Sequence, residues 1–211
     1  MNNRTQSHLF WGTDAPLSTL ISVGLMIMAT NRLAFALTVT GALVWTYGLA
    51  VLILSFAKPI LPKRGREILW IFLSGFLGSL YLMFIHLGSP YLAMETTFII
   101  LLVPLYCIGS GMCRRLEAHD PEESIPRAFL EALVLGGILV ALALIREPFG
   151  FGTFSFPGGP QGIVTLISFE SSLYFPVQII ACSSGGLLLL GYGLTLFRQF
   201  RNRDTCVEEE K

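Results

Sequence analysis

Four cysteines, Cys107, Cys113, Cys182 and Cys206, are the side chains of this 211-residue chain best suited to holding a metal. A thiolate is a strong ligand for zinc and iron, and metal sites often draw on closely spaced pairs of thiolates. The chain has no CxxC pair, and the spacing of Cys107 and Cys113 fits no common zinc ribbon. Taken alone, this pattern favours packing or membrane-edge roles for Cys113 and Cys182.

Two charged neighbours, Arg146 and Glu147, end a long apolar run. A local ion pair is one interpretation of them, and a gate or ion path is the other. The three histidines, His8, His86 and His119, are scattered, and the chain has no HExxH, phosphate-binding loop or GxSxG motif. The sequence therefore assigns no catalytic residue.

The elements that must position these residues are apolar. Residues of the AVILMFWYC set make up 53% of the chain and charged residues 13%, about half the charged share of a soluble domain. Formal net charge is zero, so the chain offers no basic face to a nucleic acid. This composition predicts an integral-membrane protein and excludes a nucleic-acid partner.

A membrane-spanning helix needs about 20 predominantly apolar residues, whereas the strands of a membrane barrel would alternate in polarity. The runs here are continuous, so we predict an all-α membrane protein forming one domain over residues 1–211. Six spans are expected, at residues 17–29, 33–56, 68–87, 96–112, 128–145 and 173–197. Residues 149–162, rich in Gly, Phe and Pro, are expected to form a loop.

Lysine and arginine are unequally divided between the two sides that six spans would create. Twelve of the 14 lie on the side of both termini, and only Arg32 and Arg146 lie on the other. Because positive charge is retained on the cytoplasmic side, both termini are predicted to be cytoplasmic in a multi-pass protein of the bacterial inner membrane.

The first and fourth spans are short and interrupted, at residues 30–32 and 109–111, and each is followed by two longer spans. This order predicts two inverted three-helix repeats. Interrupted segments at matching positions of two halves are typical of a functional site at the membrane midplane. Imperfect packing helices would leave the same pattern, and the residues do not decide between the two.

Several motifs resemble the integral-membrane subunits of the Rnf and Nqr ion-translocating electron-transfer complexes, in particular the branch that comprises the E subunit of Rnf and the D subunit of Nqr. The basic loop from Ala57 to Lys63 is similar to one in that branch, as is the stretch from Pro104 to Ala118. The most specific match is Arg146-Glu147 followed by the Gly-x-Gly-Thr at residues 150–153. The resemblance covers roughly residues 20–195.

The resemblance implies a 2Fe–2S cluster shared with a sister subunit, each chain giving one cysteine from each interrupted segment. The first such segment here has no cysteine and places Gly24 or Met26 near the expected position. In the second, Cys107 is the one nearby candidate for a metal ligand, although an ungapped count from Pro104 to Glu117 places Ser110 at the family's position. We therefore expect that the chain does not complete an ordinary four-cysteine cluster.

The resemblance implies that the chain is a subunit of a redox-driven ion-translocating oxidoreductase, with a sister membrane subunit, other complex subunits and membrane lipid as partners. Two alternatives come from other classes of protein. One is a non-redox membrane scaffold that descends from such a subunit, and the other is a small-solute transporter of the same inverted-repeat design.

Overall fold

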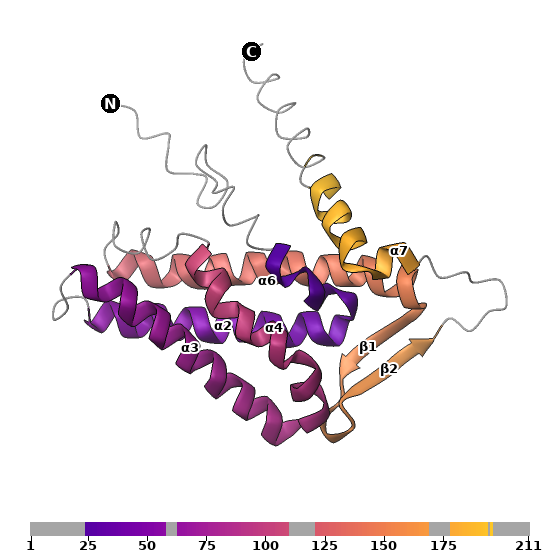
Figure 1. Cartoon of the computed structure of the whole chain (residues 1–211), viewed down its shortest axis with the longest axis horizontal. Helices are drawn as coiled ribbons and strands as arrows, with labels where there is room; N and C mark the ends of the chain where they lie inside the picture. The colour runs from indigo at the N-terminus through magenta and orange to yellow at the C-terminus, as the bar shows by residue number, and fades with distance from the viewer. Residues whose placement is uncertain (1–23, 58–62, 110–120, 169–177, 194, 196–211) are drawn as a thin grey trace, which may run out of the picture.

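The computed structural model describes residues 24–57, 63–109, 121–168, 178–193 and 195, and within them the chain is mostly helical (Figure 1). The elements, in chain order, are η2 (Gly24–Asn31), α2 (Leu33–Ala57), α3 (Lys63–Gly88), α4 (Pro90–Gly109), α6 (Pro121–Phe151), β1 (Thr153–Pro157), η3 (Gly159–Gln161), β2 (Ile163–Ser168) and α7 (Gln178–Ala181). After Cys182 the chain is helical again over residues 183–193.

Four helices are long and apolar enough to cross a membrane, namely Leu33–Ala57, Ile68–Gly88, Pro90–Cys107 and Ala128–Phe151. They correspond to the second, third, fourth and fifth spans expected from the sequence. The first expected span lies partly outside the described residues, and the sixth is divided at Cys182. A multi-pass helical fold is therefore supported, while six spans in two inverted repeats remain a prediction.

Two helices, α2 and α6, pack against each other in antiparallel directions (Figure 1). The first residue of α2, Leu33, meets Glu147 near the end of α6, whereas Tyr47, farther along α2, meets Glu131 near its start. Glycine allows the close approach, because a side chain at Gly136 would collide with Thr40. The Thr40 hydroxyl also donates to the Gly136 carbonyl at 3.3 Å.

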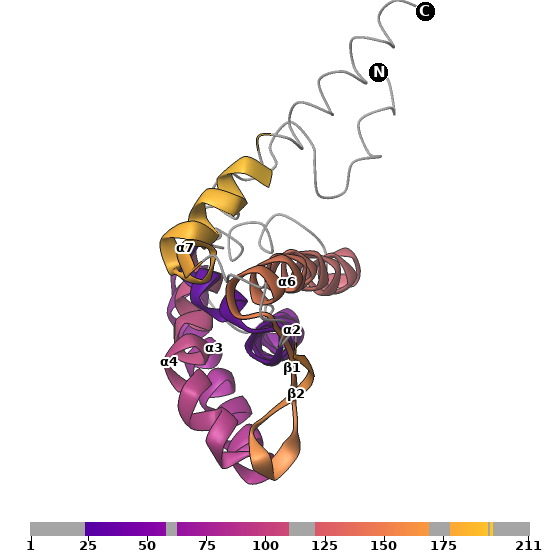
Figure 2. The same cartoon turned by 90° about the vertical axis from the view of Figure 1, so that its right-hand side faces the viewer.

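The helices α3 and α4 form a hairpin that turns at Ser89. The turn is tight because the Ser89 N–H reaches the Ile85 carbonyl at 2.7 Å and the Ser89 carbonyl accepts from Ala93. Figure 2 views α2 nearly end-on, with the α3–α4 pair on one side of it and α6 beside it. The hydroxyl of Tyr81 in α3 donates to the Thr38 carbonyl of α2 at 2.9 Å.

The outer faces of α3 and α4 carry large exposed apolar side chains, among them Phe72, Phe76, Met83, Phe98 and Leu105. A patch of this kind is costly in water and requires an apolar neighbour. Together with the length of the helices, it supports a membrane location for this part of the chain.

Residues 149–162, which were expected to form a loop, instead form the end of α6 and part of a β-hairpin. The helix α6 continues to Phe151, and β1 and β2 then pair as an antiparallel hairpin from Thr153↔Ser168 to Pro157↔Ile163. Gly152, at φ +66°, supplies the left-handed conformation that leads out of the helix. Figure 1 shows that the hairpin runs from the end of α6 to the α3–α4 turn, where Gly162 lies against Tyr91.

Candidate functional site

Two helical segments are broken, and both breaks lie beside the end of α6. The first is the change from the 3₁₀ segment η2, ending at Asn31, to α2. The second is at Cys182, which separates α7 from helical residues 183–193. Helix ends leave backbone groups without intrahelical partners, so two adjacent breaks in an apolar setting require other donors and acceptors.

Arg146 supplies donors to the second break. Its side chain is fully buried, and its Nε donates to the Ile180 carbonyl at 2.9 Å. Its Nη2 donates to the carbonyls of Ala181 and Cys182, both at 2.8 Å. The guanidinium thus satisfies three consecutive carbonyls at the C-terminal end of α7, where the helix carries partial negative charge.

The same guanidinium reaches the first break. Its Nη1 donates to the Ile27 carbonyl at 2.9 Å and to the Thr30 hydroxyl. Its Nη2 donates to Oδ1 of Asn31 at 2.6 Å. A planar group with five donors can bond to both segments at once, which a lysine ammonium could not do. Arg146 therefore fastens the two breaks to each other and to α6.

Two glycines make room for this arrangement. A Cβ on Gly186 would lie 2.7 Å from Nη1 of Arg146, and a Cβ on Gly185 would lie 2.9 Å from the Cα of Ile180. Any larger residue would push the guanidinium or α7 aside. The closest neighbours of these glycines in the structure are the guanidinium and the backbone of α7.

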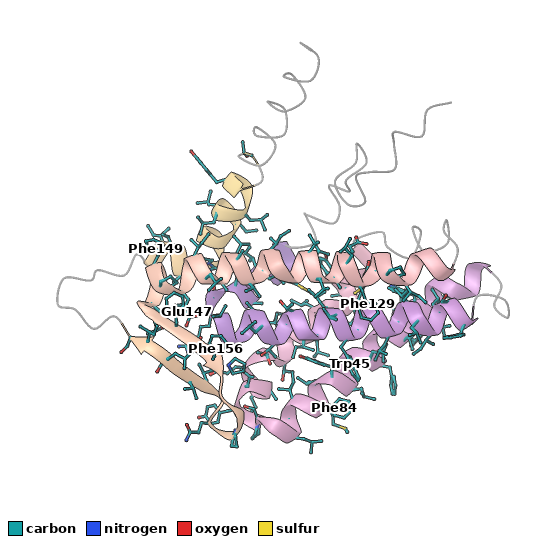
Figure 3. The ribbon with its side chains drawn as sticks, turned by 180° about the vertical axis from the view of Figure 1, so that it is seen from behind. Trp45, Phe84, Phe129, Glu147, Phe149 and Phe156 are labelled. Carbon is teal, nitrogen blue, oxygen red and sulfur yellow. The ribbon has the colours of Figure 1, made fainter. Side chains whose placement is uncertain are left out.

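Glu147 forms its hydrogen bond at a different helix end, the start of α2. It is also fully buried, and its Oε2 accepts from the backbone N–H of Leu33 at 2.6 Å. The Ser155 hydroxyl of β1 accepts from the next N–H, that of Ala34, at 3.5 Å. Figure 3 shows Glu147 between α6 and the start of α2. A carboxylate at the positive N-terminal end of a helix is a favourable placement.

The hydrogen bonds of Arg146 and Glu147 therefore go to segment ends rather than to each other. The ion-pair interpretation does not describe these contacts. Full burial, with every bond made to fixed backbone or neighbouring side chains, indicates a structural junction and offers no support for a gate. The other arginine expected on this side, Arg32, lies over the Phe151 ring with its Cζ 5.6 Å from the centroid.

Cys107, the candidate metal ligand, lies on α4 and is fully buried in an apolar cluster with Trp70, Val103 and Tyr106. Within the described ranges, no group of three or more His, Cys, Asp and Glu side chains could hold a metal ion. Cys182 lies at the second break, while Cys113 and Cys206 fall outside the described residues.

The positions at which the resemblance places cluster cysteines are only partly described, since Ser110 lies outside the described residues. The first break offers Gly24 and the fully buried Met26 where a thiolate is required. Cys107 belongs to an uninterrupted stretch of α4, two residues before the helix ends at Gly109. Its role as a metal ligand remains a prediction.

A further polar contact joins α6 to α2 through Glu131. Glu131 is half-buried, and its Oε2 accepts from the hydroxyl of buried Tyr47 at 2.9 Å. The ring of Tyr47 meets Trp70 edge-on, with centroids 6.4 Å apart. His86 is exposed near the end of α3.

Comparison with known proteins gives one recurrent similarity. No protein-family model matches the chain. The chain is 26% identical over 147 residues to the D subunit of the Na⁺-translocating NADH–quinone reductase from Chlamydia trachomatis serovars L2, D and A, covering 68% of this chain and 68% of each relative. This similarity supports a relationship, at the level of a family, to a membrane subunit of that kind of complex.

Proposed function

We propose that this chain is a membrane subunit of an ion-translocating electron-transfer complex of the NADH–quinone reductase type. The observation that carries the proposal is the similarity to the D subunit of that enzyme, which extends over about two thirds of both chains. The four apolar helices support it, because the role requires a multi-pass membrane protein.

The finer features of the proposal come from the sequence. The chain would have six spans in two inverted repeats, both termini in the cytoplasm of a bacterium, and a sister subunit of the Rnf or Nqr type as a neighbour. The interruption expected in the fourth span, at residues 109–111, falls almost entirely outside the described residues, and the second break in the structure is at Cys182 in the expected sixth span.

We also propose that the chain does not complete a four-cysteine 2Fe–2S cluster with that sister. The absence of any cysteine among the first hundred residues and the position of Cys107 in an apolar core support this view. The contribution of the chain to the complex would then be to hold the membrane bundle and its neighbours, with electrons carried by other subunits.

Purification through a tag on this chain from the native membrane tests the main proposal. We expect a sister membrane subunit and flavin-containing or ferredoxin-like subunits to copurify, and the preparation to oxidise NADH with quinone as acceptor and to drive cation uptake into proteoliposomes. A chain that purifies without redox partners would contradict the proposal and favour the scaffold or transporter alternative.

Iron and acid-labile sulfide in that preparation, together with electron paramagnetic resonance after reduction, test the cluster-free role. We expect Cys107→Ser to leave the iron–sulfur content and every signal unchanged. A 2Fe–2S signal that vanishes in the variant would show that Cys107 is a working ligand and would overturn this part of the proposal.

A further inference from the structure

Six oxygen atoms from the two broken segments converge on one positively charged group. They are the carbonyls of Ile27, Ile180, Ala181 and Cys182, the hydroxyl of Thr30 and the side-chain carbonyl of Asn31. The two segments that carry these oxygens lie far apart in the sequence and are brought together at this point. The group they surround is the guanidinium of Arg146.

This is the kind of oxygen set that binds metal cations in other membrane proteins. Where transporter helices are discontinuous, unwound carbonyls and the C-terminal ends of half-helices coordinate monovalent cations. Hard cations in general select oxygen ligands, and about six of them suffice for a complete shell. Here the ligands are assembled from two segment ends, but the centre of the site is filled by a side chain.

The oxygens that line the site carry partial negative charge, which favours a cation at its centre. The hydrogen-bond acceptors of the guanidinium among the described residues are neutral, and the nearest carboxylate in sequence, that of Glu147, is directed to the start of α2. The positive charge is therefore held by carbonyl dipoles and by the negative ends of two helical segments.

The site is also closely packed. A single added carbon at Gly186 would come within 2.8 Å of both Cζ of Arg146 and Cγ1 of Ile27. There is therefore no space for a further group between Gly186 and the guanidinium, and the Arg146 side chain is itself fully buried.

We propose that the junction of the two breaks is a cation site that the chain fills with its own Arg146. While Arg146 occupies the site, a free monovalent cation cannot take the same position among the six oxygens. With the side chain removed, the vacated site takes up a small planar organic cation, the guanidinium ion. The proposal concerns contacts within this chain and holds whether or not the chain belongs to a redox complex.

Chemical rescue tests the proposal. The Arg146→Ala variant, in native membranes and after mild solubilisation, should show a lower Tm and less folded protein than the wild type. Low-millimolar guanidinium should restore more than half of the lost Tm, whereas urea, which has nearly the same shape but no charge, should restore none at the same concentration. Sodium chloride at equal ionic strength controls for a salt effect.

Gly136→Ala is the matched control, since it disturbs the α2–α6 contact and leaves the guanidinium in place. Guanidinium should not raise its Tm. The proposal would be overturned if the Tm of folded Arg146→Ala protein did not rise with guanidinium, or rose equally with urea.

Asn31 gives a second test in a chain that keeps Arg146. Asn31→Asp preserves the acceptor at the guanidinium and adds a negative charge, so it should raise the Tm, while Asn31→Leu should lower it. These variants decide the matter if Arg146→Ala yields no folded protein under any condition. An Asn31→Asp variant as unstable as Asn31→Leu would show that the site does not favour a positive charge.

Discussion

Arg146 and Glu147 are adjacent in the chain but compensate opposite partial charges. Consecutive residues of a helix point in different directions, so their side chains reach different neighbours. Arg146 reaches the carbonyl ends of η2 and α7, and Glu147 reaches the N–H end of α2. Each charge is buried where a helix end of opposite sign faces it, which explains why both are tolerated without exposure.

Removal of either side chain should therefore destabilise the protein. We expect Arg146→Ala and Glu147→Ala each to lower the free energy of unfolding by about 1–3 kcal/mol, because charged partners are lost and buried backbone groups are left unsatisfied. Glu147→Gln should cost less, since it keeps an acceptor for the Leu33 N–H. Abundance in the membrane and Tm after solubilisation report the effect.

Glu95, which is exposed on α4, provides the control. Glu95→Gln should shift stability by no more than about 0.5 kcal/mol. If Arg146→Ala or Glu147→Ala matched the wild type in abundance and Tm, the junction around the two breaks would not contribute to stability.

At the scale of elements, the contact between α2 and α6 depends on which glycine faces the partner helix. Gly136 and Gly137 are neighbours on α6, but a Cβ on Gly136 would lie 3.1 Å from the Cβ of Thr40 and press on its methyl group, while one on Gly137 would meet nothing within 4 Å. The Thr40 Cβ belongs to a stiff, β-branched residue and cannot easily move aside.

These two positions give a paired prediction. Gly136→Ala should lower stability by about 1–3 kcal/mol through overpacking. Gly137→Ala should be neutral or raise stability by up to about 1 kcal/mol, because alanine is the better helix former. Thermal unfolding of the two variants in the same detergent measures the difference. Equal effects would mean that the helices do not meet at Gly136.

At the scale of the whole molecule, several segment ends gather at one end of the described structure. The start of α2, the α3–α4 turn and the hairpin lie together at one end, and this end contains Arg32 and Arg146. Both are engaged, one over an aromatic ring and the other by carbonyls. The exterior location of this end stays a prediction from the distribution of lysine and arginine in the sequence.

Cysteine labelling in intact cells tests this orientation. A membrane-impermeant thiol reagent added outside should modify Gln161→Cys, at the exposed tip of the hairpin, and should not modify Arg66→Cys in the basic region after α2. The wild-type chain, with its own four cysteines, sets the background. The reverse labelling pattern would overturn the orientation.

The sequence predicted the long helices well and the junctions poorly. Continuous apolar runs predicted α2, α3, α4 and α6 because length and apolarity alone are required to cross a membrane. The hairpin was missed because its strands are short and its glycines and prolines also suit a loop. Only the adjacency of an arginine and a glutamate signalled the site.

The partners of that pair could not be predicted, since they lie far away in the chain. The guanidinium bonds to Ile27, 119 residues earlier, and to Cys182, 36 residues later. No periodicity connects such positions. The sequence shows that Gly185 and Gly186 are small, but not that a larger side chain there would collide with Arg146 of α6 and the backbone of α7.

The separation of these partners in the sequence also has a consequence for synthesis of the chain, which runs from the N-terminus to the C-terminus. Arg146 is synthesised before Ile180, Ala181 and Cys182, so three of its acceptors join the chain only after it. Placing an arginine without partners at the centre of the bilayer costs about 2.5–3.5 kcal/mol or more. We therefore expect the end of α6 to take its final position only once residues 178–182 are present. We expect a chain that ends before residue 178 to leave Arg146 without these three acceptors and to accumulate to a lower level than the full chain, which pulse-chase labelling would measure.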